Sequence, residues 1–365
     1  MRKEARAALS ICAVAVTASC TLLNPLGGFA GGADDAGARP DAAADGASTG
    51  DAAGDAADGA RPLCGGKDCL GGTCLGGVCG PAMLAAAQDR PRGVALFGDH
   101  VYWVTAGGAV MRVPATGGPA EELGRGTSLV SVAVDASGVF FTDEGAGTIG
   151  RVPLAGGPVA ILASGETSPW GIALDGTYAY YTTSTAVRRV PEVGAGAATD
   201  AATGLTQPHK IVVSGGRVLW VNESGVDAVD SRLLSGGGAQ CHFNNQTLPH
   251  GLFADSSQIF HTDHRPAPDG KVRRKQLSET CSTDAVEIAV GLESPFELTG
   301  DATSLYWTVD VAAGSIVTMP KDGSAKPHEL ASGQAMPWGI AVDPNAGIVY
   351  WTTSVPSGAL FALVR

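Results

Sequence analysis

Apolar and polar positions alternate in short runs along most of the chain, and from residue 81 onward the runs recur about every 40 residues. Each repeat opens on a segment that begins with proline in six cases out of seven and continues with small and branched apolar residues. The copies begin at Pro91, Leu129, Pro169, Pro208, Pro249, Pro295 and Pro337. This spacing predicts seven copies of one structural unit.

A second segment follows each opening segment after a turn that carries Gly, Asp or Ser, and it is rich in aromatic and β-branched residues. Such runs are typical of β-strands. They are centred on Tyr102, Phe140, Tyr180, Leu219, Phe260, Tyr306 and Tyr350. A third segment alternates apolar and polar residues, as in Val110–Pro114 and Val187–Pro191, and Gly-Pro turns lead to a short outer segment such as 160–163.

Four short strands in about 40 residues form one blade of a β-propeller. The seventh copy ends at Arg365 after its third strand, whereas Met83–Ala87 precedes the first copy and aligns with the fourth strands at 161–165 and 329–333. Pairing these two incomplete parts would close the ring and remove an exposed strand edge. The sequence therefore predicts an all-β fold, a seven-bladed β-propeller with one-plus-three closure over residues 81–365.

The first 20 residues have the pattern of an export signal, with basic residues at the start and a short apolar stretch that ends in small residues before Cys20. The segment Val16–Cys20 is similar to a bacterial lipobox, which predicts lipidation at Cys20; Thr21 after it fits an outer-membrane lipoprotein of the cell envelope. Ordinary signal cleavage further on, for instance after Ala30, is the alternative.

Residues 21–62 are rich in Ala, Gly and Asp and hold one aromatic residue, Phe29, so we expect a disordered linker. Residues 63–80 form a small cysteine knot with regular spacing at Cys64, Cys69, Cys74 and Cys79. An oxidising compartment favours two disulfides here over a zinc site, although four cysteines allow three pairings. Cys241 and Cys281 remain and are predicted to form a third bridge.

Charge and sequence motifs exclude several classes of function. A net charge of −12 argues against binding to nucleic acid and against electrostatic attachment to anionic lipid, so a lipid anchor is the expected membrane contact. The compact signatures of serine hydrolases, zinc proteases, nucleotide-binding P-loops and dinucleotide-binding folds are absent from the sequence.

The second strands resemble those of YWTD and NHL-type propellers, most closely at Tyr306-Trp307-Thr308, Tyr350-Trp351-Thr352 and Phe140–Asp143. This resemblance covers about residues 82–365 and implies the propeller fold. Propellers host unrelated binding and enzymatic activities, so the resemblance implies no particular function.

The loops that lead into the first strands and those between second and third strands share one face of a propeller, where function usually lies. The residue after each opening position gives a ring of candidate ligand-binding residues around the channel: Arg92, Val130, Trp170, His209, His250, Phe296 and Trp338. The two tryptophans either stack on a sugar or another flat ligand, or wedge between blades. Both interpretations stay open.

His209 and His250 occupy equivalent positions of neighbouring blades, and Glu223 and Asp263 reach the same face. Imidazoles beside carboxylates can hold a divalent metal or act as acid and base, whereas a histidine alone is often a hydrogen-bonded channel residue. Weaker similarity to streptogramin lyases, seen at Phe141–Glu144 and Ile149–Val152, implies His250 as base, Glu223 as metal-binding or orienting residue, and a possible magnesium cofactor.

Two functions remain in competition. The first is an exported, lipid-anchored binding propeller that recognises a protein or an envelope glycan and needs no cofactor. The alternative is a metal-assisted lyase or hydrolase that uses the histidines and carboxylates at the channel mouth.

Overall fold

The computed structural model describes residues 61, 63–194, 196–224 and 227–365, and within these residues all regular structure is β-strand. The predicted export signal, Cys20 and nearly all of the linker predicted at 21–62 lie outside the described residues. The described part contains no helix long and apolar enough to cross a membrane.

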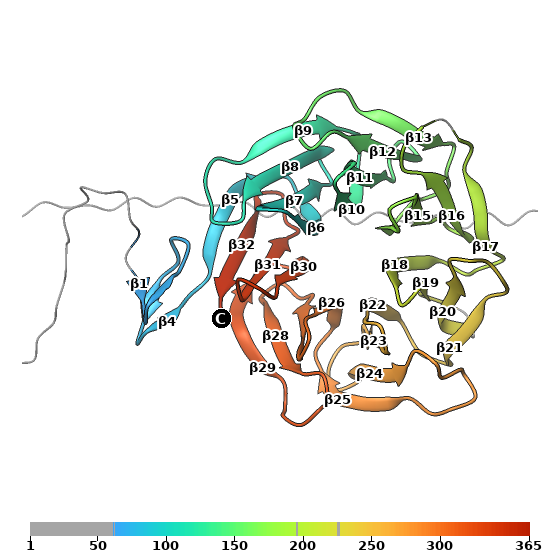
Figure 1. Ribbon diagram of the computed structural model, residues 1–365. Coiled ribbons are helices and arrows are strands. Elements are labelled where there is room, and N and C mark those ends of the chain that lie inside the picture. Colours follow the sequence, from blue (N-terminus) through green and yellow to red (C-terminus); the bar gives the residue numbers. More distant parts are fainter. Residues whose placement is uncertain (1–60, 62, 195, 225–226) are drawn as a thin grey trace, which may run out of the picture. The chain divides into compact units, whose positions relative to one another are not determined.

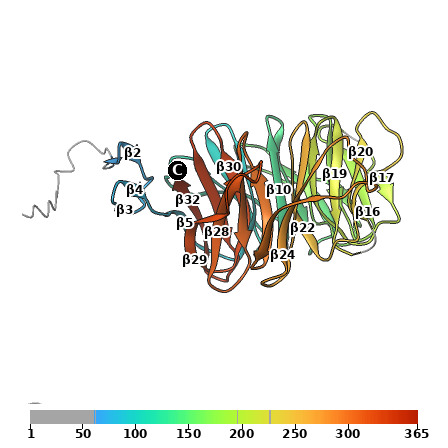
Figure 2. The same ribbon diagram turned by 90° about the horizontal axis from the view of Figure 1, so that it is seen from below.

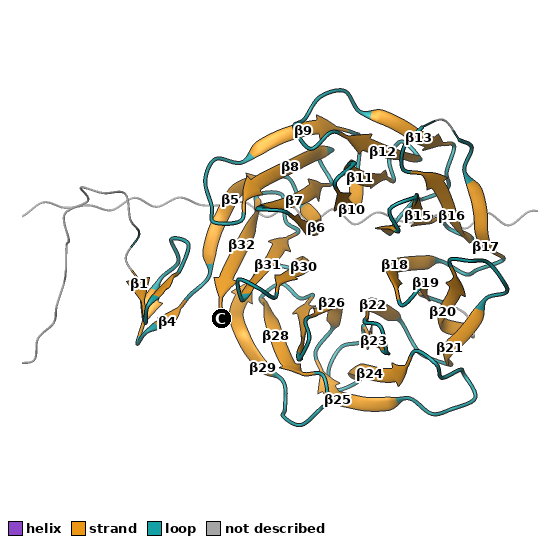
Figure 3. Cartoon of the chain, viewed as in Figure 1, coloured by secondary structure: helices purple, strands orange, loops and turns teal. Residues whose placement is uncertain are grey.

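Seven four-stranded antiparallel sheets surround a central channel, and each sheet runs from an inner to an outer strand (Figures 1 and 3). The predicted seven-bladed propeller is therefore confirmed. Blades 1 to 3 consist of β6 (Pro91–Phe97), β7 (His100–Thr105), β8 (Ala109–Pro114) and β9 (Glu121–Arg125); β10 (Leu129–Asp135), β11 (Gly138–Asp143), β12 (Thr148–Val152) and β13 (Ala160–Ser164); and β14 (Ile172–Leu174), β15 (Tyr178–Thr182), β16 (Ala186–Pro191) and β17 (Thr199–Thr203).

The remaining blades follow the same order around the ring. Blades 4 to 7 consist of β18 (Pro208–Ser214), β19 (Arg217–Asn222), β20 (Asp227–Leu233) and β21 (Gln240–Asn244); β22 (Pro249–Ala254), β23 (Gln258–Asp263), β24 (Gly270–Gln276) and β25 (Val286–Leu292); β26 (Pro295–Gly300), β27 (Ser304–Val309), β28 (Gly314–Pro320) and β29 (His328–Gln334); and β30 (Pro337–Asp343), β31 (Ile348–Thr353), β32 (Gly358–Val364) and β5 (Ala82–Gln88).

The ring closes through β5, the first strand of the propeller in sequence, which pairs with β32, the last (Figure 1). Leu360 lies opposite Ala85, and Phe361 lies opposite Met83. Ala82, Leu84 and Ala85 are buried in a cluster that also contains Trp103 and Tyr350, so the strand fills part of the core. The predicted one-plus-three closure is confirmed.

The core consists of apolar clusters between adjacent blades, and the second strands supply its largest side chains. Trp103, Trp220, Trp307 and Trp351 are each at most 1% exposed because both faces of these strands are covered by neighbouring blades. Seen from the side, the blades stand next to one another around the channel (Figure 2). This explains why the second strands are continuously apolar rather than alternating.

Threonines near the ends of the second strands connect neighbouring blades. Thr142 Oγ1 donates a hydrogen bond to Trp170 O of the next blade (2.6 Å) and accepts one from the backbone N–H of Ser131 (3.1 Å). The same pair of bonds recurs at Thr182, Thr262, Thr308 and Thr352. The threonine of the Tyr-Trp-Thr pattern thus fixes the inner strand of its own blade to the inner strand of the next.

Replacing Thr142 by Val should lower the free energy of unfolding by about 2 kcal/mol, because a carbonyl and an N–H that are both partly buried each lose their partner. Urea unfolding monitored by tryptophan fluorescence measures this change. Thr148→Val, on the third strand of the same blade, is the matched control for the substitution itself. A loss for Thr142→Val no larger than that of the control would contradict the role assigned to the hydroxyl.

The cysteine-rich segment forms two short hairpins, β1–β2 (Leu63–Cys64 and Lys67–Asp68) and β3–β4 (Cys74–Leu75 and Val78–Cys79). Of the three pairings that the sequence leaves open, the structure has Cys64–Cys74 and Cys69–Cys79. Lys67 Nζ donates to the backbone O of Arg365.

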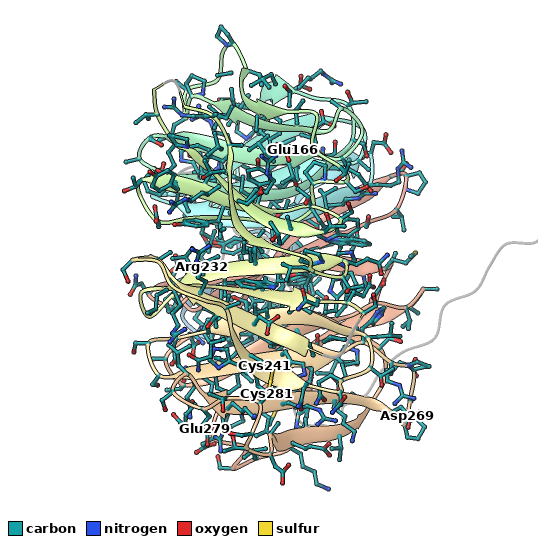
Figure 4. All side chains as sticks on the ribbon, turned by 90° about the vertical axis from the view of Figure 1, so that its right-hand side faces the viewer. Glu166, Arg232, Cys241, Asp269, Glu279 and Cys281 are labelled. Carbon is teal, nitrogen blue, oxygen red and sulfur yellow. A yellow bond between two sulfur atoms is a disulfide. The ribbon has the colours of Figure 1, made fainter. Side chains whose placement is uncertain are left out.

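Cys241 is bonded to Cys281, as predicted, and the bond is drawn in Figure 4. The two cysteines come from neighbouring blades and from different kinds of segment. Cys241 lies within β21, the fourth strand of blade 4, whereas Cys281 lies between β24 and β25 of blade 5. The backbone N–H of Cys281 also donates to Cys241 O (3.1 Å).

Candidate functional site

A repeated loop contact places the ring residues at one mouth of the channel. In six blades the residue before the opening proline has a positive φ, from 32° at Ser294 to 52° at Leu248. The loop between the second and third strands of each blade donates a backbone N–H to a carbonyl of this connection. The donors are Ala106, Glu144, Ser184, Glu223, His264, Asp310 and Ser354. Their side chains therefore surround the ring.

Five of the seven predicted ring residues have ring side chains, and these pack against one another. Trp170 stacks on His209 with ring centroids 4.6 Å apart, and His250 stacks on Phe296 at 3.8 Å. Trp338 contacts Phe296 edge-on at 4.8 Å and lies 6.4 Å from Trp170. We call these five side chains the aromatic cluster. The two tryptophans neither project singly from the surface nor pack only between blades, because they contact the other rings of the cluster.

The other two ring residues differ in environment. The Arg92 guanidinium lies 5.6 Å from the centre of the Trp338 ring and 3.9 Å from Glu144. Val130 is buried. Trp170, His209, Trp338 and Arg92 stay half-buried, whereas His250 and Phe296 are each 4% exposed. The face available to a ligand thus consists of two tryptophans, one imidazole and one guanidinium.

Three imidazoles lie near one another at this mouth. The ring centroids of His264 and His209 are each 5.9 Å from that of His250. Burial lowers the pKa of all three, most strongly that of His250, where the nearby imidazoles and Lys210 act in the same direction. For His209, Glu223 opposes the effect of burial; its Oε2 lies 3.3 Å from His209 Nδ1. The folded protein therefore favours neutral imidazoles.

The predicted metal ligands do not come together. Asp263 Oδ1 lies 3.1 Å from His261 Nε2, and its Oδ2 accepts from Arg273 Nε at 2.9 Å. His250 is stacked on Phe296, and only Glu223 reaches His209. Among the described residues, one group of three His, Cys, Asp or Glu side chains has ligand atoms close enough to share an ion, and it consists of Cys64, Cys69 and Cys79, whose sulfurs are in disulfides. His209, His250, Glu223 and Asp263 therefore do not form such a group of three in this structure.

A cavity of about 70 Å³ lies in the channel next to Trp170 and Trp338. It has room for a few water molecules but not for an organic substrate. Lys210 and Glu297 line it and form an ion pair that connects blades 4 and 6, although blade 5 lies between them.

Sequence reasoning missed Lys210, Glu297 and Asp310. A signal existed for the first two, because each directly follows a ring residue at a position where Gly93, Gly171, Gly251 and Gly339 stand in other blades. A Cβ at Gly251 would lie 2.2 Å from Phe296 O, so glycine there allows close approach of adjacent inner strands. A charged residue at such a position departs from the repeat.

The buried imidazoles predict loss of stability in acid. An unfolded histidine takes up a proton below its ordinary pKa of about 6.5, whereas His250 in the folded protein does so only at much lower pH. Stability is therefore present above pH 6.5 and falls as the pH drops through the interval between the two pKa values. Replacing His250 by Phe removes this titrating group and should therefore reduce the loss of stability at pH 5.

Thermal unfolding at pH 8 and pH 5 measures the effect. From pH 8 to pH 5, the unfolding midpoint of the His250→Phe protein should fall by less than that of the wild type. Trp338→Phe changes a neighbouring ring without removing a titrating group, and its midpoint should fall with pH as the wild type's does. Identical pH dependence in all three proteins would refute the prediction.

No known protein-family model matches the chain. Among solved structures, it is similar to a chain of a nidogen–laminin complex, at 22% identity and a TM-score of 0.52, covering 71% of this chain and 97% of that one. It is also similar to a gluconolactonase from Xanthomonas campestris, at 14% identity and a TM-score of 0.53, covering 79% and 91%. The WD40 domain of Neurospora crassa Pan2 matches at 10% identity and a TM-score of 0.59, covering 78% and 96%. These likenesses establish the β-propeller fold of the chain.

Proposed function

We propose that this protein is an exported, lipid-anchored β-propeller that binds a protein or a glycan of the cell envelope at the mouth carrying the aromatic cluster. The observation that carries the proposal is the mutual packing of the ring residues. The five rings support one another, so Trp170 and Trp338 offer a preformed contact surface at low cost in side-chain entropy. Three disulfides in the described residues fit an oxidising compartment.

Two further apolar side chains extend this surface. Leu248 and Met336 occupy positions immediately before opening prolines and are 45% and 41% exposed. At the equivalent positions of four other blades stand Arg90, Ser168, Gln207 and Ser294. Because they precede ring residues in the loops that lead to the channel mouth, we include them in the proposed contact surface.

Binding to envelope fractions of the native host tests the proposal. Peptidoglycan, outer-membrane proteins and lipopolysaccharide are presented separately to the protein, and bound protein is quantified. Met336→Asp and Leu248→Asp should weaken saturable binding to one fraction at least tenfold. Ile161→Asp, at an outer-strand residue that is 55% exposed, is the matched control and should bind normally. Equal binding by all variants, or no saturable binding by the wild type, would overturn the proposal.

The alternative, a metal-assisted lyase or hydrolase, rests on the approach of His209 to Glu223. The small cavity and the stacked position of His250 weigh against it. Metal analysis of protein purified without chelators separates the two functions. One equivalent of divalent metal that is lost in both His209→Ala and Glu223→Ala would favour the enzyme.

The anchor has its own test. Replacing Cys20 by Ala should release the protein from the membrane fraction of its native host, because Cys20 is the residue that the lipobox-like segment designates for lipidation. Cell fractionation and immunoblotting measure the distribution, and Cys12→Ala is the matched control within the same segment. Unchanged membrane association of the Cys20→Ala protein would refute the lipid anchor.

A further inference from the structure

A second candidate site lies between blades 3 and 4, outside the channel mouth. It follows from an arginine that recurs on the third strands, opposite the aromatic residue of the second strand. Arg112 of blade 1 lies opposite Tyr102, and its Nη1 donates to Leu154 O of blade 2 at 2.7 Å. Arg274 of blade 5 lies opposite Phe260, and its Nη1 donates to Lys321 O of blade 6 at 3.2 Å. In both blades this arginine binds the backbone of the following blade.

Arg189 is the equivalent residue of blade 3, since it lies opposite Tyr180. Its guanidinium instead lies 4.5 Å from the centre of the Tyr178 ring, and its Nε is buried without a hydrogen-bond partner. Burying a guanidinium N–H without an acceptor costs free energy. A ligand oxygen that accepts a hydrogen bond from this Nε would remove that cost.

A cavity of about 100 Å³ adjoins Arg189, between blades 3 and 4. Arg232 and Ser235 of blade 4 line its other side, and Arg232 also donates through Nη1 to Ala201 O of blade 3. Arg232 is labelled in Figure 4, near the boundary between the two blades. Two guanidinium groups from different blades therefore border one cavity.

The balance of charge in this cavity is positive. Asp200 is the one carboxylate among its lining residues, and its Oδ1 accepts from Arg188 Nε at 2.9 Å. Arg188 is in turn bound to Glu166 on its other side. Arg189 also contacts the Tyr180 hydroxyl, but Asp200, the one lining carboxylate, is bound to Arg188, so Arg189 and Arg232 can attract a negative charge.

We propose that this cavity binds a small oxyanion, a phosphate or a carboxylate group, between Arg189 and Arg232. The planar guanidinium offers paired donors that match the oxygens of such anions. The hydroxyl of Ser235 can add a third donor, and the volume suffices for one group of this size in place of several waters. The site involves no residue of the channel mouth, so the proposal does not depend on the proposed function.

The experiment measures thermal unfolding of the full chain in sodium phosphate, sulfate, acetate and chloride at matched ionic strength. Phosphate or acetate should raise the midpoint saturably by at least about 2 °C over chloride, as expected when a ligand binds the folded state. A shift with phosphate and sulfate alone identifies a phosphate-type ligand, and a shift with acetate alone identifies a carboxylate. Equal midpoints in all four salts would overturn the proposal.

Variants locate the effect. Arg189→Gln should abolish the anion-dependent shift, whereas Arg112→Gln, which removes the equivalent arginine of blade 1, should keep it. If Arg189→Gln fails to fold, Arg189→Lys is used instead. It keeps the charge but loses the paired donors of the guanidinium, so the affinity for the anion should fall about tenfold. A shift of wild-type size in a folded Arg189 variant would show that the anion binds elsewhere and would refute the site.

Discussion

Removing residues 82–87 should abolish cooperative unfolding of the propeller or lower its midpoint by at least about 10 °C. These residues form most of β5, the strand that completes blade 7 by pairing with β32. The deletion removes the buried side chains of Ala82, Leu84 and Ala85 and exposes the edge of β32 to solvent. Truncating a buried leucine alone costs about 2–5 kcal/mol, and lost strand pairing adds to this. The total approaches the whole stability of a typical domain, about 5–15 kcal/mol.

Thermal unfolding followed by circular dichroism measures the change. Removing six residues from the Ala- and Asp-rich segment, 41–46, is the control for chain length. Two point variants separate packing from pairing: Leu84→Ala should be clearly destabilised, whereas Met83→Ala, at a side chain that is 57% exposed on the same strand, should stay close to wild type. Equal midpoints for the deletion and its length control would rule out closure by β5.

The fold was predictable from sequence because each level of the repeat specifies the same structure. The opening prolines mark the inner strands, the aromatic runs mark strands that are covered on both faces, and the similarity of Met83–Ala87 to the fourth strands predicts closure. The disulfide Cys241–Cys281 was also predictable, although the position of Cys241 within β21 was not. The register of a short outer strand depends on turn length, which varies between blades.

For the candidate site, the sequence predicted which residues form the ring, but not how they are arranged and not the charged residues next to them. Equivalent positions around a ring must lie near the channel, so the seven ring residues could be named from the repeat. Their mutual stacking and the separation of Asp263 from His209 depend on side-chain rotamers, which the spacing does not specify. The cavity beside Arg189 was even harder to predict. The equivalent arginines look alike in the sequence, although those of blades 1 and 5 bind a backbone carbonyl and the Nε of Arg189 has no partner.

The ion pair between Lys210 and Glu297 leads to the second large effect. Glu297 is 10% exposed and Lys210 is 28% exposed, so the pair is largely withdrawn from water. Replacing Lys210 by Met should lower the free energy of unfolding by about 3 kcal/mol, because the Glu297 carboxylate is then left in the channel without its cation. Glu297→Gln should cost less, about 2 kcal/mol, since the more exposed ammonium of Lys210 keeps part of its hydration.

The double variant Lys210→Met, Glu297→Leu distinguishes a stabilising pair from one that only avoids an unpaired charge. Two apolar side chains of similar size need no counter-ion, so the double variant should recover most of the stability lost in Lys210→Met. Urea unfolding of the wild type and the three variants at pH 7 supplies the comparison. Losses that simply add in the double variant would mean that the two charges do not interact, and that the contact connecting blades 4 and 6 through the channel contributes nothing to the closed ring.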